Sequence, residues 1–314
     1  MMTNSVSLPT TPYPMLGKSI PLVLNWTWRA MLSSLLLSTL HGADVTIAET
    51  KSPAAAVSTP PKSGQPCSVT LPGNVALDLA PIPAGTFTMG SPDSEEGRLL
   101  DEGPQHQVTI SKNFWLGKYP VTQTQYLALT GENPSVFRTD PSLPVEYVTW
   151  DNAVAFCKKL TEQEKAAGRV PAGYAYQLPT EAQWEYACRA GTKTPYAGDL
   201  EAMTWYDKNS NGTSHPVGQK KPNAWGLYDM HGNIRQWCID KYLPYAADAV
   251  TDPVGLKGQY RNIRGGAWYL YARYCRSAAR FSAVPGGIGG NSGFFTSSIL
   301  GFRVALAPEL VIKP

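Results

Sequence analysis

The sequence predicts a loop-rich fold that combines short strands with short helices. Strand-like runs at Gly85–Met89 and Gln107–Ile110 are brief and are separated by turn-forming residues. Two helix-forming stretches open with a threonine followed three residues later by a glutamine, which is the spacing of a capping box. The chain also contains 28 glycines and 27 prolines, which favour turns and ordered loops over long regular elements.

The first 70 residues are expected to precede the folded domain. Residues 1–48 have the pattern of a secretory leader, because Lys18 and Arg29 precede the apolar run at residues 30–40, which is too short to span a bilayer. Residues 49–70 are a linker rich in proline, alanine and serine, and the domain occupies residues 71–314, with order beginning near Cys67–Leu79. The leader predicts export to the periplasm or the cell surface. If residues 1–48 are a disordered tail instead, the protein is cytoplasmic.

An acidic segment separates the two strand-like runs. Its carboxylates could line a cation site, but a solvated loop explains them better, because charge runs usually face water. The acids concerned are Asp93, Glu95, Glu96, Asp101 and Glu102.

Three helices are expected downstream of the acidic segment, at about Thr122–Leu129, Asp151–Lys165 and Thr180–Gly191. Cys157 and Cys188 share the apolar faces of the second and third of these helices, so both are expected in the core. Cys238, flanked by Trp237 and Ile239, is also expected there. Residues 222–240 place large apolar side chains around two glycines and are expected to form a compact loop-rich element, not a helix or a long strand.

Composition and charge exclude several classes of function. The formal net charge of +3 over 314 residues gives no indication of nucleic-acid binding. The five cysteines are widely spaced without a C-x-x-C pair, so they form neither a disulfide framework nor a zinc signature, and the odd number leaves at least one thiol unpaired.

The stretch Arg264–Arg303 has an unusual composition. Its aromatic and aliphatic residues follow neither a helical nor a strand period. Residues 269–303 contain no Lys, Glu, Gln, Met or Trp, although the rest of the chain uses all five. None of these five residue types has a codon that ends in a pyrimidine. Every residue that lies between the fixed-looking positions of the stretch does have such a codon. The pattern therefore concerns the gene as well as the protein.

Several motifs resemble the sulfatase-modifying-factor family, which contains the formylglycine-generating enzymes. They are IPAGTFTMGS, YPVTQTQY, PVEYVTWDNAVAFCKKL, YQLPTEAQWEYACRAG, NAWGLYDMHGNIRQW, RGGAW and GFRVA, and they occur in the order typical of that family. The resemblance extends from Pro81 to Ala307. It implies an α+β fold, namely a variant of the C-type lectin fold in which much of the chain forms ordered loops.

The resemblance implies that the family's copper chemistry is incomplete here. The enzymes of the family bind copper(I) through two cysteines; Cys275 matches the second, and Leu270 occupies the position of the first. Copper(I) requires soft thiolate ligands, and one thiolate does not hold it in that way. Copper and a catalytic Cys275 are thus expected only if the chain is an enzyme. Arg273 and Arg276 could lower the pKa of Cys275, but a buried packing role explains this residue better.

The family also binds a structural calcium ion, and the resemblance assigns four matching positions. They are Asp229, Gly232, Ile234 through its carbonyl group, and Gln236. Gln236 replaces a glutamate of the family, which lowers the expected affinity for a hard cation. The neighbouring Arg235 replaces a common aromatic residue. Calcium therefore stays an open prediction, and no other cofactor is expected.

The scaffold and the codon pattern together resemble the variable proteins of diversity-generating retroelements. In those systems, error-prone copying at adenines converts template asparagine codons into any codon that ends in a pyrimidine, within the 3′ end of the target gene. The resemblance implies a non-catalytic display protein with residues 264–303 as its variable region. The expected ligand-binding residues are Tyr269, Leu270, Tyr271, Tyr274, Ala279, Phe281, Ser282, Ala283, Phe294 and Phe295.

The arginines of this stretch are expected to hold its backbone in place through hydrogen bonds to loop carbonyls. They are Arg264, Arg273, Arg276, Arg280 and Arg303, and any acids that pair with them must come from elsewhere in the chain. The expected partner is an unknown protein or surface ligand, not a nucleic acid. Three alternatives stay open: an ordinary variable loop on a family member, a formylglycine-generating oxidase of cysteine-containing peptides, and an inactive accessory subunit.

Overall fold

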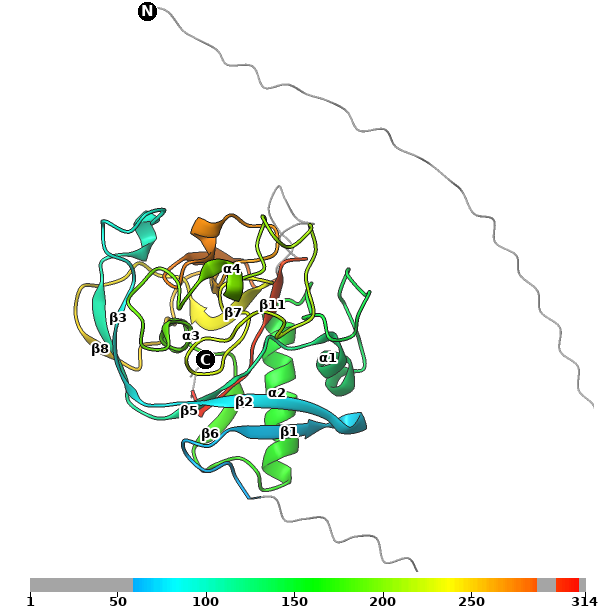
Figure 1. Cartoon of the computed structure of the whole chain (residues 1–314). Helices are drawn as coiled ribbons and strands as arrows, with labels where there is room; N and C mark the ends of the chain where they lie inside the picture. The colour runs from blue at the N-terminus through cyan, green and yellow to red at the C-terminus, as the bar shows by residue number, and fades with distance from the viewer. Residues whose placement is uncertain (1–58, 287–297, 311–314) are drawn as a thin grey trace, which may run out of the picture. The chain divides into compact units, whose positions relative to one another are not determined.

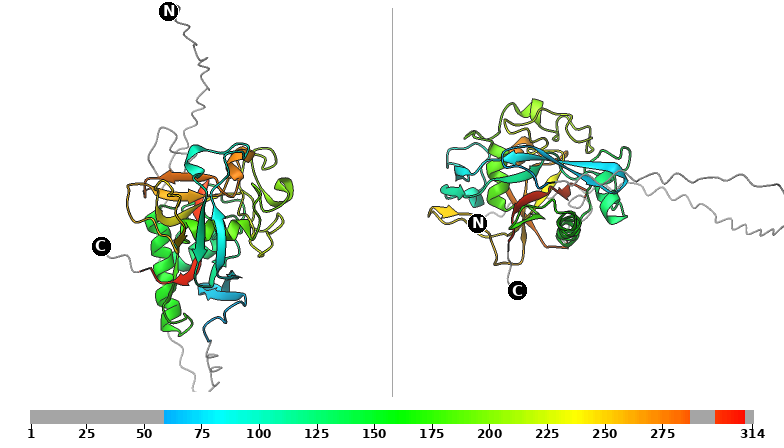
Figure 2. Two further views of the ribbon diagram at one scale, coloured as in Figure 1. Left: turned by 90° about the vertical axis from the view of Figure 1, so that its left-hand side faces the viewer. Right: turned by 90° about the horizontal axis from the view of Figure 1, so that it is seen from below.

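The computed structural model describes residues 59–286 and 298–310, and the expected leader at residues 1–48 lies outside them. The described residues form three small sheets with helices packed against them (Figure 1, Figure 2). No helix among them is long and apolar enough to cross a lipid bilayer. The strands are β1 Cys67–Leu71, β2 Val75–Ile82, β3 Gly85–Met89, β4 His106–Ile110, β5 Phe114–Gly117, β6 Tyr174–Gln177, β7 Arg235–Lys241, β8 Val250–Thr251, β9 Arg261–Arg264, β10 Arg280–Ala283, β11 Leu300–Phe302 and β12 Ala305–Pro308. The α-helices are α1 Gln123–Thr130, α2 Trp150–Ala166, α3 Glu181–Arg189 and α4 Leu200–Met203, and the 3₁₀ turns are η1 Pro72–Asn74, η2 Leu100–Glu102 and η3 Ala272–Cys275.

A five-stranded sheet joins the two ends of the domain, in the order β1-β2-β5-β12-β6. β1 pairs with β2 from Cys67 onward, four residues before the expected domain boundary. β12 is antiparallel to both β5 and β6. The C-terminal strand is therefore an interior strand of this sheet.

A four-stranded sheet carries the stretch Arg264–Arg303, in the order β10-β9-β7-β11. β7 is antiparallel to β9 and parallel to β11. The expectation of a loop-rich element at residues 222–240 is wrong for its second half, because β7 occupies Arg235–Lys241. The five inner residues of β7 are all buried, so the strand lacks the alternation of polar and apolar residues that marks a half-exposed strand.

The expected strands at Gly85–Met89 and Gln107–Ile110 are confirmed as β3 and β4, which pair antiparallel in a third sheet. The three expected helices are confirmed as α1, α2 and α3. Thr122 and Thr180 cap α1 and α3, and in each case a glutamine three residues later completes a capping box. α3 ends at Arg189, followed by Ala190 in the left-handed region, close to the expected stop.

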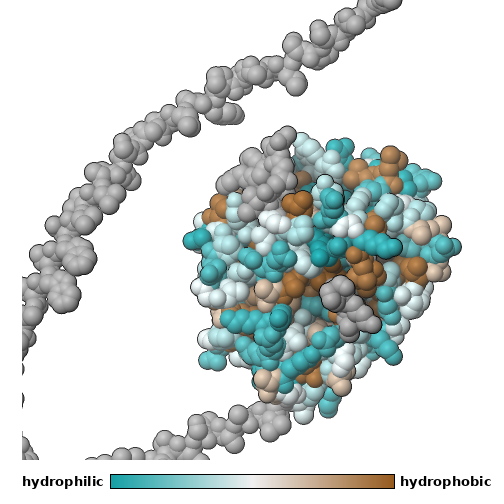
Figure 3. Space-filling view, turned by 180° about the vertical axis from the view of Figure 1, so that it is seen from behind, coloured by the Kyte–Doolittle hydropathy of each residue, from teal (hydrophilic) through white to brown (hydrophobic). Residues whose placement is uncertain are grey.

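Two hydrophobic clusters form most of the core. The larger packs α1 and α2 against the five-stranded sheet and includes Cys157, and the second surrounds α3 and includes Cys188 and Cys238. All three cysteines are fully or almost fully buried, which confirms the expectation for each. Seen from behind, the surface formed by the described residues mixes hydrophilic with hydrophobic residues (Figure 3).

Candidate binding surface

Two consecutive glycines begin the stretch after β9. Gly265 has a φ of +83°, a conformation that side chains disfavour. A Cβ atom on Gly266 would lie 2.3 Å from Cys275 Sγ and 2.5 Å from the carbonyl oxygen of His231, so no larger residue fits. The pair lets the chain turn from β9 onto the loop that leads to η3.

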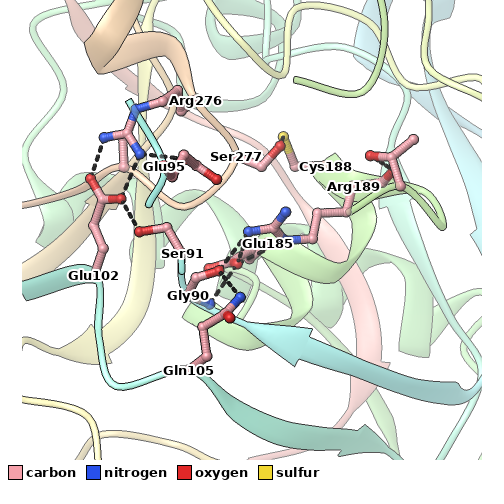
Figure 4. A network of polar contacts seen from close by, with 12 residues as sticks. Gly90, Ser91, Glu95, Glu102, Gln105, Glu185, Cys188, Arg189, Arg276 and Ser277 are labelled. Carbon is pink, nitrogen blue, oxygen red and sulfur yellow. Dashed lines mark hydrogen bonds and ion pairs between the residues drawn. The ribbon is translucent and has the colours of Figure 1, made fainter. Parts of the chain in front are cut away.

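Arg276 follows η3 and holds that turn against the acidic segment. Its guanidinium donates to both carboxylate oxygens of Glu102 and, at 2.6 Å, to Glu95 (Figure 4). It also donates to the carbonyl oxygens of Gly97 and Arg273. Glu95 and Glu102 have only 4% and 0% of their side chains exposed. A solvated loop is therefore wrong for these two acids, because they neutralise a buried arginine.

Arg264 and Arg280 fasten the segment to α3. Arg264 is completely buried and forms ion pairs with Glu181 and Glu185, while its Nη1 donates to the carbonyl oxygens of residues 277 and 279. Arg280 donates to both oxygens of Glu181 at 2.7 and 2.9 Å. Glu185 is also held by Arg189, and these opposing charges keep its pKa below the usual range despite burial. The last residue of β9 and the first residue of β10 are thereby tied to one helix.

Arg303 anchors the far end of the stretch without an ion pair among the described residues. It donates to the carbonyl oxygens of Gly117 and Tyr228 and to Gln236 Oε1. Burial lowers its pKa to about 10, so it keeps its charge at neutral pH. Arg264, Arg276, Arg280 and Arg303, the scaffold arginines, thus make the expected bonds to loop carbonyls. Arg273 does not: it is exposed, and its side chain donates to Tyr274 Oη.

The predicted calcium ligands do not form an open coordination site. Gln236 Oε1 accepts from Trp184 Nε1 at 2.8 Å and from Arg303 Nε at 3.0 Å, which uses both of its lone pairs. Asp229 Oδ2 accepts from the Gly218 N–H. In this arrangement Gln236 does not fit a calcium ion, and the predicted set is reduced to Asp229 and the backbone carbonyls of Gly232 and Ile234. Calcium binding itself stays a prediction.

Cys275 is a packing residue in this structure. It is completely buried, and burial raises the pKa of its thiol to about 12. Leu270 is partly buried and packs against a small cluster that contains Ile234 and Trp268. No group of three or more His, Cys, Asp or Glu residues in the described part of the chain is arranged to hold a metal ion. The geometry does not fit a two-thiolate copper(I) centre.

His231 connects the segment to the loop before α4, a contact with no signal in the sequence. Its Nε2 accepts from the Ala197 N–H at 3.0 Å, and its Nδ1 lies 2.8 Å from the Cys275 carbonyl oxygen, so the proton belongs on Nδ1. Cys188 Sγ is 3.8 Å from both ring nitrogens. Burial lowers the pKa of His231 to about 4 and raises that of Cys188 to about 12. The two side chains are therefore neutral at pH 7, and they form no activated nucleophile.

The predicted ligand-binding residues divide by exposure. Tyr269 and Tyr271 have 46% and 63% of their surface exposed. Ser282 is exposed, and four further residues are partly buried: Leu270, Tyr274, Phe281 and Ala283. We call these seven residues the display face. Ala279 is completely buried, so its side chain does not reach this face, and including it with the surface residues is corrected here. Phe294 and Phe295 lie outside the described residues.

An open pocket of about 350 Å³ borders the display face. It is lined by Asp207, Lys208, Tyr271, Ala272 and Arg273. The loop that carries Asp207 is held to the segment by the Asp207 N–H, which donates to the Leu270 carbonyl oxygen at 3.1 Å. Asp207 and Lys208 lie more than 60 residues from Tyr271 in sequence, and no motif points to them.

Comparisons with known proteins agree with this geometry. Residues 70–306 match the family model described as sulfatase-modifying factor enzyme 1-like domain. The chaperone protein LppX of Paenibacillus barcinonensis is 30% identical over 249 residues, covering 64% of this chain and 82% of that protein. The formylglycine-generating enzyme of Mus musculus is 27% identical over 290 residues, covering 69% of this chain and 73% of the enzyme.

Solved structures show the same fold. Variable protein 1 of Treponema denticola has a TM-score of 0.67 at 29% identity, over 77% of this chain and 99% of that one. PvdO of Pseudomonas aeruginosa has a TM-score of 0.64 at 28% identity, over 78% and 99% of the two chains. The motifs, the α+β fold and the family match lead to one conclusion: the chain belongs to the sulfatase-modifying factor enzyme 1-like family.

Proposed function

We propose that this chain is a non-catalytic ligand-binding protein whose display face is diversified by a retroelement. One observation carries the proposal: most side chains that the resemblance implies to be fixed are buried, whereas most of those expected to vary are not. Among the fixed ones, Trp268, Cys275, Arg276 and Ser277 are buried, Ala272 is partly buried and Arg273 is exposed; among the variable ones, Tyr269 and Tyr271 are exposed. Such a division lets the surface change without repacking the core.

The scaffold arginines supply the physical basis for this tolerance. Their bonds run to the acidic segment, to α3 and to backbone carbonyls, and none runs to a side chain of the display face. The conformation of η3 and β10 therefore depends on groups that diversification leaves unchanged. The exposed tyrosines suit recognition, because each offers a large rigid ring and a hydroxyl group at low entropic cost.

The similarity to a Treponema denticola protein titled a variable protein supports the proposal. We further propose that residues 1–48 direct export, so that the display face meets its ligand outside the cytoplasm. Mass determination of the mature protein from cells that express the whole gene tests this point. Removal of residues 1 to about 48 supports export, and an intact N-terminus in the cytoplasmic fraction contradicts it.

Two libraries, one of surface residues and one of buried residues, test the display function. The first varies Tyr269, Leu270, Tyr271, Tyr274 and Ser282; the matched control varies the buried residues 275 and 277–279. Both are displayed on phage and selected for resistance to protease. Exposed substitutions change the free energy of unfolding by about 0.5 kcal/mol or less each, so most members of the first library should survive. Most members of the control should be cut, because buried substitutions cost about 1–5 kcal/mol.

The same libraries define the outcome that contradicts the proposal. If the surface library loses members as often as the buried control, the display face is part of the core and does not tolerate exchange. If it survives, panning it against an arbitrary protein should yield binders that differ at Tyr269–Tyr274. The gene gives an independent test. A near-copy of its 3′ end that differs only at adenines, beside a reverse-transcriptase gene, is expected in the adjacent DNA.

A formylglycine-generating oxidase is the second candidate, favoured by the formylglycine-generating enzymes among the relatives and by the presence of Cys275. Copper(I) titration separates it from the first candidate. Tight stoichiometric binding that is lost in Cys275→Ala would support the oxidase. The display function predicts no such binding, because Leu270 supplies no second thiolate.

A further inference from the structure

Arg235 is a cation that lies against Phe281 of the display face and has no counter-charge among the described residues. It is the first residue of β7, and its guanidinium carbon lies 3.5 Å from the centre of the Phe281 ring. Its Nε is buried and has no hydrogen-bond partner. None of the ion pairs among residues 59–286 and 298–310 involves this side chain.

The scaffold arginines show how differently the fold treats its other buried cations. Arg276 alone donates five hydrogen bonds, two of them to one carboxylate. Arg264 and Arg280 share Glu181. Arg303 has two carbonyl oxygens and an amide oxygen. Within the described part of the chain, the guanidinium of Arg235 has only the face of the Phe281 ring, which attracts a cation but satisfies none of its N–H donors.

The environment of Arg235 favours an incoming anion. Burial lowers its pKa to about 10, so it is still charged at neutral pH but is poorly solvated. A partly buried charge without a partner is unfavourable, and a carboxylate placed against it gains a charge-assisted bond in a region of low dielectric. In the family that the sequence resembles, an aromatic residue is common at this position, so the charge is a feature of this chain.

A chain of contacts leads from Arg235 to a second exposed guanidinium. Phe281 packs edge-on against Tyr274 at 5.9 Å between ring centres. Arg273 lies over the Tyr274 ring at 4.6 Å and donates to its hydroxyl oxygen at 2.7 Å. Arg273 and Lys208 both line the open pocket beside Tyr271, where Asp207 is the single acid. The display face therefore presents cations and rings with little negative charge.

We infer that Arg235 is a fixed anchor that binds a carboxylate group of the ligand while the surrounding variable rings contact the rest of it. The inference rests on the proposed function, because it treats the display face as the binding site. It adds what that proposal leaves open, namely the chemical class of the ligand: a carboxylate attached to an apolar or aromatic group. The planar guanidinium fits a carboxylate in the bidentate geometry, and a ring beside it can pack on Phe281 or Tyr269.

Benzoate is the probe, since it joins a carboxylate to one ring, and benzamide is the uncharged control of the same shape. Titration of the folded protein is followed by NMR at the arginine Nε–H signals. The signal absent from Arg235→Gln identifies Arg235. We expect that signal to shift saturably with benzoate and not with benzamide. Arg235→Gln should weaken benzoate binding about tenfold or more.

Arg261→Gln is the matched control. Arg261 stacks on Trp150 at the same 3.5 Å and also has a buried Nε without a partner, but its Nη1 donates to the Ile239 carbonyl oxygen. It pairs with Lys241 at the other end of β7 and with Ala283 at the edge of the display face. Benzoate affinity should be unchanged in this variant. Binding that persists in Arg235→Gln, or that is lost equally in Arg261→Gln, overturns the inference.

The Tm of Arg235→Phe distinguishes a ligand anchor from an arginine that only stabilises the fold, because the two roles predict Tm changes of opposite sign. It restores an aromatic residue and removes the unpaired charge, so the Tm should rise by about 2 °C or more while benzoate binding is lost. A fall in Tm would mean that Arg235 stabilises the fold, and it would overturn the anchor assignment. These results are independent of the library experiment, which tests tolerance to exchange and can fail or succeed whether or not Arg235 binds carboxylates.

Discussion

Replacing Arg276 by glutamine tests the claim that the acidic segment and η3 hold each other in place. The substitution removes five hydrogen bonds and the cation that neutralises Glu95 and Glu102. Glu102 is completely buried, so its carboxylate would be left in a low-dielectric site without a counter-charge. Removing one partner of a buried ion pair typically costs about 3–5 kcal/mol.

The assay is equilibrium unfolding in urea, followed by tryptophan fluorescence. Arg276→Gln should lower the midpoint without changing the m-value, and it should lower the Tm by roughly 6–20 °C in a domain of this size. The matched control is Arg273→Gln, three residues earlier, whose side chain is exposed and bonds only to Tyr274; it should change stability by about 0.5 kcal/mol or less. Adding Glu102→Gln to Arg276→Gln should recover part of the loss, because both charges are then gone.

A small loss would refute this reasoning. If Arg276→Gln costs less than about 1 kcal/mol, the ion pairs contribute no more than surface contacts do. The conformation of η3 would then have to depend on packing around Cys275, and diversification of its neighbours could not be neutral.

Three further predictions concern buried groups. Ala279→Tyr should cost at least about 1–3 kcal/mol through overpacking, whereas Ser282→Tyr on the same strand region should be nearly neutral in a thermal melt. His231 has a folded-state pKa of about 4, below its ordinary value of 6.5, so the unfolded chain binds the extra proton first and stability should fall as the pH drops from about 6.5 to 4. In urea titrations at several pH values, His231→Gln should reduce that fall; an unchanged slope would contradict a neutral buried His231. Finally, Cys275 should resist thiol reagents at pH 8 in the folded state and react only on unfolding, and rapid native-state labelling would show that its thiol is accessible.

The helices could be predicted because their signals are local. Thr122 and Thr180 predict the starts of α1 and α3, because each has a glutamine only three residues later that completes a capping box. β7 could not be read in this way, since its inner residues are buried on both faces and its partners β9 and β11 lie far along the chain. Its buried polar residues, such as Gln236, then resemble those of a loop.

The acidic segment shows the same limit for the site. Glu102 bonds to Arg276 across 174 positions, and nothing near either residue indicates the pairing. The absence of acids from the arginine-rich stretch did indicate that partners come from elsewhere, but not which ones. The expectation that Ala279 lies on the surface rests on the pyrimidine-ending codons of alanine, but alanine is equally common in cores. Only packing distinguishes the two roles.

The position of β12 has a consequence for how new variants are screened. This strand follows the variable region in the chain, yet it lies between β5 and β6 in the interior of the five-stranded sheet. Under the proposed function, codons that end in a pyrimidine never encode a stop, but a copying event that shifts the reading frame within the variable region destroys β12 as well. The remaining sheet exposes two unpaired edges and part of its core, which makes the product a substrate for proteases. Placing a structural strand downstream of the diversified codons therefore couples display to correct translation of the whole gene.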